Sequence, residues 1–323
     1  MKCTIQNIAD HLGLSRNTVS KALKNSSEVS ENTRNLVIKT ASKLGYKNAT
    51  FATPVIPASE TGSNGTILFL TRTYASDSEF WTTVLRGIES ILSNANYHLA
   101  ISIMSDSDLK QLNFPQTISD SSIKGIILVE ICDKVVCDAL SQFNLPIVSV
   151  DMPNVPFEEL NGIDVVTMES KKNLKKIINQ LIEKGAESFG FVGDLYSPNV
   201  SRGFQERYNA LSECLAEHQL PLNQKNCLLH QTPEDFRNFQ TTVNNLQAMI
   251  SLPDVFICGN DWTAIQLIYA LQFLGFQIPK DICVVGFDNI PAASRISPSL
   301  TTISTPQKYL GIAAARQILE RIQ

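Results

Sequence analysis

The chain has 323 residues, of which 43% are apolar and 18% are charged, and its formal net charge is −4. This composition excludes a disordered protein, and the length accommodates a small domain followed by a larger, two-part body. The amino terminus has no apolar signal core, and no run approaches the roughly 18 uninterrupted apolar residues of a membrane span, so we expect a cytoplasmic protein.

The cysteines and histidines do not indicate a metal site. The seven cysteines form no C-x-x-C pair and the four histidines are scattered, so we expect reduced, buried thiols rather than a disulfide or metal framework. The sequence also lacks a Walker loop, a G-x-G-x-x-G fingerprint and a G-x-S-x-G elbow. We therefore predict no catalytic residue, no metal and no cofactor.

The first 24 residues predict two short helices joined by a tight turn. Thr4 is a suitable N-cap, and Gly13 ends the helical spacing that follows it. Ser15 then caps a second helix, so the pattern is that of a helix-turn-helix. The apolar faces of the two helices consist of Ile5, Ile8, Ala9 and Leu12 in the first, and Val19, Ala22 and Leu23 in the second.

The second helix carries a polar arc opposite its apolar face. A turn of about 100° per residue places Arg16, Asn17, Ser20, Lys21 and Lys24 on this arc. Arginine can bind guanine O6 and N7, and asparagine adenine N6 and N7, in the major groove. The alternative is an ordinary solvated helix face, which also carries Lys and Arg.

A third helix is predicted from Ser30 to Gly45, with Val37, Ala41 and Leu44 on one face. Residues 1–48 hold eight Lys and Arg residues against three Asp and Glu residues, which leaves −9 for the rest of the chain. A basic first domain on an acidic body favours DNA binding confined to one end.

Several short stretches of this domain resemble the lactose-repressor (LacI/GalR) family of bacterial regulators: Thr4-Ile-Gln-Asn-Ile-Ala, Gly13-Leu-Ser, Thr18-Val-Ser and Leu44-Gly-Tyr46. The resemblance implies that Arg16, Asn17 and Lys21 face bases in the major groove. The predicted DNA-binding set is Thr4, Ser15, Arg16, Asn17, Thr18, Ser20, Lys21 and Lys24.

A linker rich in Thr, Ser, Pro and Gly follows at residues 49–65. In the resembling family this segment carries a hinge helix whose Leu inserts into the minor groove. Here the matching position falls near Val55, which Pro54 and Pro57 flank, and the Ala-Arg-x-Leu-Ala pattern is absent. Because proline interrupts helical hydrogen bonds, we expect an extended or differently folded linker.

From residue 66 onward, short apolar runs alternate with helical patterns, which is the rhythm of β-α-β units and a parallel sheet. The first unit is predicted to have strands at 66–71, 97–104, 125–129 and 147–150 and a helix at 78–94. The second is predicted to have helices at 171–184, 205–218 and 263–274 and strands at 188–192, 255–258 and 282–286.

The body also resembles the effector-binding core of the family, which is similar to periplasmic sugar-binding proteins. The matching stretches are Cys258-Gly-Asn-Asp261, the segment from Gly275 to Asp288, and Ser297-Pro-Ser-Leu-Thr-Thr-Ile303. The predicted fold is therefore an all-α helix-turn-helix domain at 1–48, a linker at 49–65, and an α/β two-lobed core with parallel sheets at 66–323. The first lobe is expected at about 66–162 plus 304–323, and the second at about 163–303.

Candidate ligand-binding residues follow strands of this core. Arg207 and Asp288 supply donors and acceptors that suit a polyhydroxylated molecule such as a sugar. The resemblance implies that they bind effector hydroxyls together with Asn260. The alternatives are a pairing of Arg207 with Glu206 or a neighbour at the helix start, and a turn capped by Asp288.

Further effector candidates are Phe80 and Trp81, whose alternative is a place in the hydrophobic core, and Asp151 after the strand at 147–150. The second-lobe aromatic of the family corresponds to His230, Phe236 or Phe239, without a choice between them. Met168-Glu169 replaces the Asp-Asn pair usual in the family, and Lys171 and Lys172 follow, which keeps an anionic effector open.

We predict a transcriptional regulator, a repressor of carbohydrate metabolism, that binds a near-palindromic DNA operator as a homodimer. A small-molecule effector between the lobes, with a sugar as the expected class, is predicted to control DNA affinity. The alternatives are a regulator that responds to a phosphosugar, a nucleobase or a partner protein, a binding protein without DNA affinity, and an enzyme on the same scaffold.

Overall fold

The computed structural model describes residues 4–23, 29–30, 33–34, 36–37, 40–41, 63–72, 78–131, 133–150, 153, 155–195, 201–230 and 238–323. The chain divides into two compact units, Met1–Gly62 and Ser63–Gln323, which we describe separately and call the head and the core. Most of the predicted linker, including Pro54, Val55 and Pro57, lies outside the described residues.

The head contains the two predicted helices, α1 (Ile5–Leu12) and α2 (Arg16–Leu23). Thr4 caps α1 through a reciprocal capping box with Asn7, and Gly13 ends the helix at φ 64°, a conformation that favours glycine. The Ser15 hydroxyl accepts a hydrogen bond from the Thr18 backbone N–H at 3.0 Å, so the predicted cap of α2 is confirmed.

A third helical segment completes the core of the head. Residues 33–34, 36–37 and 40–41 are helical, and the Ser30 hydroxyl accepts a hydrogen bond from the Thr33 N–H. The predicted end of this helix at Gly45 lies outside the described residues. The three segments bury one apolar cluster: Ile8, Ala9, Val19, Ala22, Val29, Val37 and Ala41.

The first lobe of the core is built on a parallel sheet with strand order β2-β1-β3-β4-β5. Its strands are β1 (Gly65–Thr71), β2 (Tyr97–Ile103), β3 (Ile123–Val129), β4 (Ile147–Val150) and β5 (Asp164–Val166). Its helices are α4 (Glu79–Asn94), α5 (Asp106–Gln111) and α6 (Lys134–Ser141), with single 3-10 turns at Gln116–Ser119 and Phe157–Glu159.

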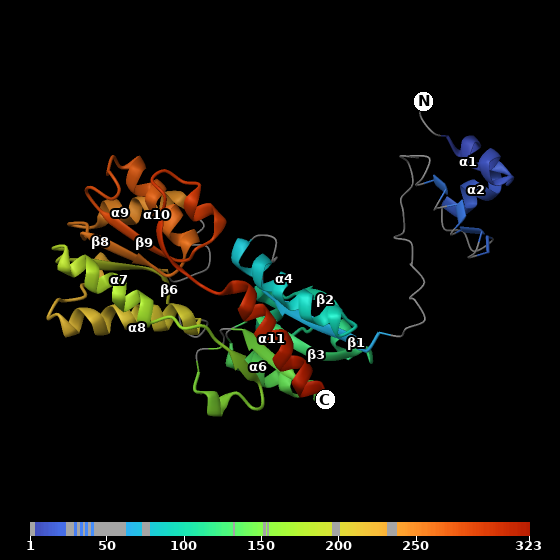
Figure 1. The fold of residues 1–323 in the computed structure, drawn as a ribbon, viewed down its shortest axis with the longest axis horizontal. Helices are drawn as coiled ribbons and strands as arrows, with labels where there is room; N and C mark the ends of the chain where they lie inside the picture. Colours follow the sequence, from blue (N-terminus) through green and yellow to red (C-terminus); the bar gives the residue numbers. More distant parts are fainter. Residues whose placement is uncertain are drawn as a thin grey trace. The chain divides into compact units, whose positions relative to one another are not determined.

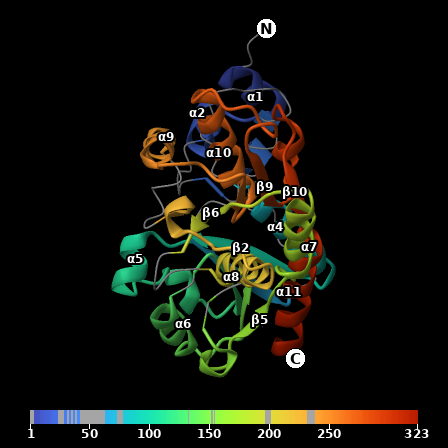
Figure 2. The same ribbon diagram turned by 90° about the vertical axis from the view of Figure 1, so that its left-hand side faces the viewer.

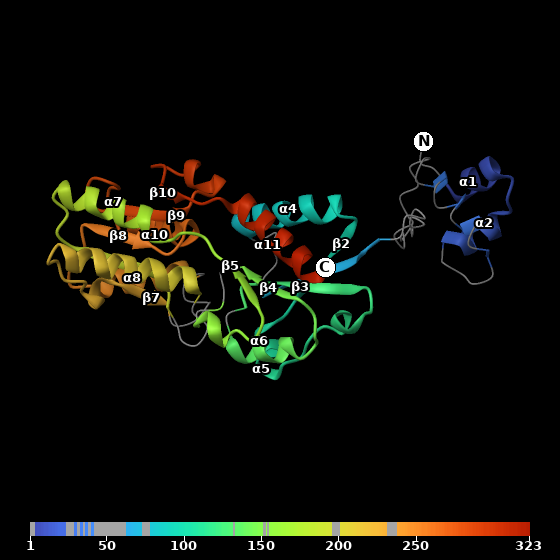
Figure 3. The same ribbon diagram turned by 60° about the horizontal axis from the view of Figure 1, so that its bottom comes forward.

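Alternate residues of the central strands face two different helical layers, as a period of two requires. Ile67 and Phe69 of β1 belong to the cluster that includes α4 residues, whereas Leu68 and Leu70 belong to the cluster that includes α6 residues. Figure 3 shows α4 and α11 along one face of this sheet and α5 and α6 along the other. Both faces are covered, which explains the nearly continuous apolar runs of these strands.

The second lobe repeats the arrangement with strand order β10-β9-β8-β6-β7, all parallel. Its strands are β6 (Phe189–Asp194), β7 (Leu228–His230), β8 (Val255–Cys258), β9 (Cys283–Asp288) and β10 (Thr301–Ser304). The helices α7 (Lys172–Glu183) and α8 (Arg202–Glu217) lie on one side of this sheet, and α9 (Phe239–Ala248) and α10 (Asp261–Phe273) lie on the other (Figure 1). Two 3-10 turns lie at Gln224–Asn226 and Pro291–Ser294.

The last helix, α11 (Gln307–Ile322), returns to the first lobe after β10 and runs beside α4 (Figures 1 and 2). Most element ends lie within two residues of the prediction, and three differences bear on the lobes and the site. β5 pairs with β4, so the first lobe continues past residue 162 to Val166. α8 begins at Arg202, three residues before the predicted start, because Ser201 caps it. β9 extends two residues past its predicted end, so Asp288 is the last residue of the strand and not a residue after it.

The five cysteines among the described residues are free thiols. Burial raises the pKa of Cys137 to about 12, so this thiol stays protonated and behaves as a small apolar side chain. In the part of the chain that the structure describes, no helix is long and apolar enough to cross a bilayer. The same residues contain no group of three or more side chains arranged to hold a metal ion.

Candidate DNA-reading helix and effector site

The polar edge of α2 carries the residues predicted to face DNA. Arg16 and Asn17 are solvent-exposed in the first turn of the helix, and Ser20 and Lys21 are partly exposed. Val19 and Ala22 are buried against the other segments of the head, so α2 can turn only this edge outward. Lys24 lies outside the described residues.

Three other predicted DNA-binding residues have structural partners within the head. The Thr4 hydroxyl donates to Asn7 Oδ1 at 2.6 Å, and the hydroxyls of Ser15 and Thr18 are 2.8 Å apart. These contacts fix the beginnings of α1 and α2. The positive end of a helix dipole also attracts phosphate, so the same positions are compatible with DNA contact.

Arg207 lies in the second turn of α8 and is 3% exposed. Its Nη1 donates to the carbonyl oxygen of Gly259 at 2.6 Å, and its guanidinium carbon lies 3.8 Å from the centre of the Phe287 ring. Among the described residues no carboxylate lies within ion-pair distance of it, and its buried Nε has no hydrogen-bond partner. The predicted alternative, an ion pair with Glu206, is therefore not formed.

Asn260 and Asp288 lie at the carboxyl ends of the neighbouring strands β8 and β9. Asn260 caps α10, because its Oδ1 accepts a hydrogen bond from the Thr263 N–H at 2.9 Å. Asp288 is 8% exposed and has a φ of 117°, a conformation that strains any residue with a side chain. Since Arg207 contacts Gly259, the residue before Asn260, and Phe287, the residue before Asp288, the fold brings all three predicted residues to one sheet edge.

Asp261, which is not among the residues predicted from the sequence, holds this edge together. Its side chain is fully buried, it accepts a hydrogen bond from the Ile290 N–H at 2.9 Å, and the Thr302 hydroxyl donates to its other oxygen. A Cβ at Gly286 would lie 2.2 Å from Asp261 Oδ1, so glycine is needed there. Burial raises the pKa of Asp261 to about 6, against these hydrogen bonds, which lower it.

The aromatic residues predicted to contact the effector lie in different surroundings. Phe80 is 8% exposed and belongs to the main hydrophobic cluster, so the structure places it in the core. Trp81 is partly buried and packs edge-on against Phe80, with ring centres 4.8 Å apart. Phe239 packs against Phe273 on the surface of the second lobe. Asp151 and Phe236 and the side chain of His230 lie outside what the structure describes.

Glu130 is a cleft candidate that the sequence argument missed. It follows β3 directly, has a φ of 57°, and its Oε2 lies 3.5 Å from the Thr71 hydroxyl at the end of β1. The signal was available, since Glu130 is a polar residue immediately after a buried strand, and ligands bind at the carboxyl ends of parallel strands.

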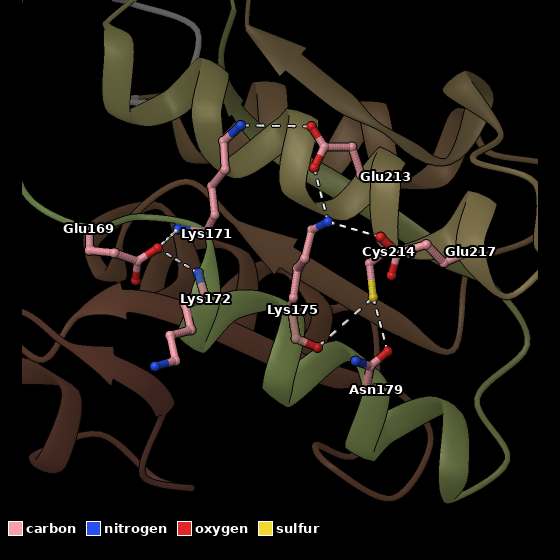
Figure 4. A network of polar contacts seen from close by, with 8 residues as sticks. All are labelled: Glu169, Lys171, Lys172, Lys175, Asn179, Glu213, Cys214 and Glu217. Carbon is pink, nitrogen blue, oxygen red and sulfur yellow. Dashed lines mark hydrogen bonds and ion pairs between the residues drawn. The ribbon is translucent and has the colours of Figure 1, made fainter.

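Of the two lysines at the start of α7, Lys171 is paired with a carboxylate of α8, whereas the contact of Lys172 is made by its backbone N–H. Lys171 Nζ lies 3.7 Å from Glu213 on α8, and Lys175 Nζ lies 2.9 Å from the same carboxylate (Figure 4). The Glu169 carboxylate accepts hydrogen bonds from the backbone N–H groups of Lys171 and Lys172 at 2.7 and 2.6 Å. The positive end of α7 is thus occupied by a side chain of the protein itself.

Loops at the carboxyl ends of the two sheets contact each other. Arg202 of α8 donates from Nη2 to the carbonyl oxygens of Val155 at 2.6 Å and Pro153 at 3.2 Å, and it lies over the Phe157 ring. Glu79 of α4 accepts a hydrogen bond from the Ala292 N–H at 3.0 Å. A molecule bound beside Asn260 and Asp288 would therefore lie close to both lobes.

A groove of about 500 Å³ lies at the opposite edge of the second sheet, where Pro253, Asp254 and Ile282 precede β8 and β9. None of the predicted effector residues lines it.

Comparison with known proteins finds a matching family model for the head and another for part of the core. Residues 4–48 match the model of the bacterial regulatory proteins of the lacI family, and residues 178–323 match that of a periplasmic binding protein-like domain. The chain is 27% identical to catabolite control protein A of Staphylococcus xylosus, over 98% of this chain and 91% of the relative. It is 27% identical to the ribose operon repressor of Haemophilus influenzae, over 99% and 92%. It is 26% identical to the transcriptional repressor PurR of Photobacterium profundum, over 99% and 92%.

Solved structures of similar fold cover the same span. A transcriptional regulator CelR in complex with cellobiose has a TM-score of 0.68 at 19% identity and covers 99% of this chain and 93% of its own. A lac repressor dimer bound to operator and an anti-inducer has a TM-score of 0.66 at 19% identity and covers 100% and 93%. With a lacI-type helix-turn-helix head, a two-lobed periplasmic-binding-protein-like core, and full-length relatives that are repressors, the chain belongs to the LacI family of DNA-binding transcriptional regulators.

Proposed function

We propose that this regulator binds a near-palindromic DNA operator as a homodimer and represses transcription, and that an uncharged, polyhydroxylated effector held near Asn260 and Asp288 sets its DNA affinity. Its partner is chromosomal DNA, so we place its action in the cytoplasm.

The observation that carries the DNA-binding proposal is the outward edge of α2. Arg16 and Asn17 are exposed in the first turn, while the buried face of the helix and the Ser15 cap fix its orientation in the head. Arginine and asparagine are the side chains that form bidentate contacts with guanine and adenine. Recognition helices read bases from this first turn.

An exposed aromatic face on α10 supports the homodimer. Trp262, Tyr269 and Phe273 are 47%, 43% and 67% exposed, and their spacing of seven and four residues places them on one side of the helix. Phe239 extends this face by packing against Phe273. Large aromatic side chains are enriched at protein interfaces, and a relative of similar fold is a dimer on its operator. Two-fold symmetry of the protein would require two symmetric half-sites.

The effector proposal depends on the group of Arg207, Asn260 and Asp288. Their amide, guanidinium and carboxylate groups offer the mixture of donors and acceptors that sugar hydroxyls need. The named relatives include a ribose operon repressor and a cellobiose complex. An anionic effector such as a phosphosugar has less support, because Lys171 pairs with Glu213 and the Glu169 carboxylate occupies the start of α7, which leaves Lys172 as the lysine of this pair without an ion pair among the described residues. A nucleobase remains the second candidate, since PurR is also a relative.

Selection from a random pool of DNA duplexes by the full chain tests the DNA proposal. We expect enrichment of a palindromic sequence, and we expect Arg16→Ala combined with Asn17→Ala to reduce its affinity at least tenfold, the order of a lost base contact. Arg316→Ala, at an exposed arginine of α11, is the matched control. Failure to enrich any sequence, or equal affinity of the double variant and the control, would contradict the proposal.

A thermal-shift screen of the full chain against neutral sugars, sugar phosphates and nucleobases tests the effector proposal, because a ligand of the folded state raises the melting temperature. We expect a neutral sugar to stabilise the wild type and not Asp288→Asn. Stabilisation only by sugar phosphates, or a sugar response that survives in Asp288→Asn, would reject the proposed effector class or site while leaving the DNA proposal intact.

A further inference from the structure

The turn that follows β9 is bonded to the first lobe at two points. The carbonyl oxygen of Asp288 accepts a hydrogen bond from Gln307 Nε2 at 2.6 Å, and the Ala292 N–H donates to Glu79 Oε2 at 3.0 Å. Arg295 Nη1 adds a longer contact of 3.8 Å to the same carboxylate. Gln307 begins α11, and Glu79 begins α4.

Those two helices belong to one rigid part of the first lobe. A Cβ at Gly311 of α11 would lie 2.0 Å from the carbonyl oxygen of Val84, and a Cβ at Gly87 of α4 would lie 2.2 Å from that of Lys308. The backbones are therefore in direct contact, and α4 and α11 cannot move independently of each other. Gln307 and Glu79 therefore belong to a single rigid body, and both of their bonds attach the turn to that body.

The second lobe holds the same turn from the other side. Asp261 accepts a hydrogen bond from the Ile290 N–H, and the Thr302 hydroxyl, which donates to Asp261, accepts one from the Asn289 N–H. Asp288 and Asn289 have φ values of 117° and 54°. Backbone in such sparsely populated conformations persists only where the surroundings fix it, so the turn has little freedom to absorb a displacement between the lobes.

Gln307 is placed to transmit movement across this turn. It is 8% exposed, and its amide reaches the Asp288 carbonyl oxygen, which also accepts a hydrogen bond from the Thr305 hydroxyl at 3.2 Å. A lost partner for a buried amide or carbonyl is unfavourable, so the bond resists separation of the two lobes at this point.

We propose that Gln307 is a positioning residue that fixes the orientation of the two lobes by holding the peptide group of Asp288 to the first lobe, with Glu79 as the second contact. The side chain of Asp288 belongs to the proposed effector site, so a ligand there and the lobe orientation act on one turn. The link to an effector rests on the proposed function, whereas the positioning role does not need a ligand.

The chain offers a matched control on the same helix. Gln317 of α11 donates from Nε2 to Asp164 Oδ2 at 2.8 Å, but Asp164 belongs to β5, so this bond stays within the first lobe. Gln307→Leu and Gln317→Leu each remove one glutamine hydrogen bond and keep a side chain of similar size. Only the first removes a bond between the lobes.

The test measures single-molecule energy transfer between fluorophores at Lys110 in the first lobe and Lys280 in the second, both exposed, attached through bio-orthogonal amino acids in the ligand-free full chain. We expect the transfer-efficiency peak to shift or broaden in Gln307→Leu, and to match the wild type in Gln317→Leu. The Arg202 contacts remain in both variants, so we expect a changed orientation and not separation of the lobes.

Glu79→Ala provides a second variant, because the Glu79 side chain is 40% exposed and its removal leaves no cavity in the core. We expect a shift in the same direction as that of Gln307→Leu. Folded Gln307→Leu and Glu79→Ala proteins with the wild-type transfer distribution would overturn the positioning role. Titration of the wild type with D-ribose, followed by the same energy transfer, tests the proposed function separately. Its outcome does not affect the positioning role, which is judged from the ligand-free variants.

Discussion

Replacing Gly311 by alanine should destabilise the core, although the same change stabilises an ordinary helix. The added methyl group would lie 2.0 Å from the Val84 carbonyl oxygen, whereas ordinary contacts begin near 3.4 Å. The obstacle is backbone and not the flexible end of a side chain, so α4 and α11 must move apart. That movement loosens a seam formed by buried residues: Val84, Ile88, Leu310, Ala314 and Ile318.

The magnitude follows from two opposing contributions. Overpacking a well-packed core costs about 1–3 kcal/mol, and the upper end applies where backbone must shift. Replacing glycine by alanine in a helix contributes about 1 kcal/mol in the opposite direction. We expect a net loss of about 2 kcal/mol in the free energy of unfolding.

Urea unfolding followed by tryptophan fluorescence measures this loss in the core alone, because both tryptophans, Trp81 and Trp262, lie in α4 and α10. Ala313→Gly, at an exposed position of the same helix, is the opposite substitution and serves as the control. Helix propensity alone predicts opposite signs for the two variants, whereas the packing argument predicts that both are destabilised. A Gly311→Ala protein as stable as the wild type would refute the argument.

Three further predictions concern side chains of the second lobe. The pKa of Asp261 is raised from 3.8 to about 6, so the folded state holds a proton between about pH 4 and pH 6 that the unfolded state has released. The free energy of unfolding should therefore fall by about 3 kcal/mol as the pH rises through this window. Urea titrations at several pH values should show that Asp261→Asn flattens this pH dependence. An unchanged pH dependence in the variant would exclude Asp261 as the group responsible. Glu169→Ala should lower the free energy of unfolding by about 1 kcal/mol, the usual effect of losing a helix cap. Glu169→Gln keeps an acceptor oxygen and should recover most of that loss in the same urea assay. Lys175→Met should leave the melting temperature almost unchanged, because its partners Glu213 and Glu217 are 49% and 60% exposed. A large fall in the melting temperature would show that the ion pairs in Figure 4 are more than a solvated surface network.

Local features of the chain were predictable because they depend on neighbouring residues. The caps at Thr4 and Ser15, the glycine stop at Gly13 and most helices and strands of the core follow from spacing and from the hydrogen bonds a residue can make within three or four positions. The elements without a prediction were short or weakly patterned. The strands β5 and β7 have three residues each, too few for a period to be recognised, and α11 presents small residues, including Gly311, to its partner helix.

The candidate site shows the same division. The sequence singled out Arg207, Asn260 and Asp288 by their positions after strands and by family resemblance. It did not identify Asp261, whose role depends on the distant Thr302. It also omitted Glu130, although the position of this residue directly after a buried strand was a local signal. Phe80 matched an aromatic position of the resembling family, but the structure buries it in the core.

The sequence by itself determined the helix-turn-helix head, the β-α-β rhythm and the kind of side chain available at each strand end, because these depend on local periodicity and residue chemistry. Only the tertiary structure decided which of those side chains meet. Glu79 and Ala292 are 213 residues apart in the chain, and the Asp288 carbonyl and Gln307 belong to different lobes. Contacts of this kind arise when two sheets, each stable through its own buried faces, bring their carboxyl ends together, and no local pattern in the chain encodes that meeting.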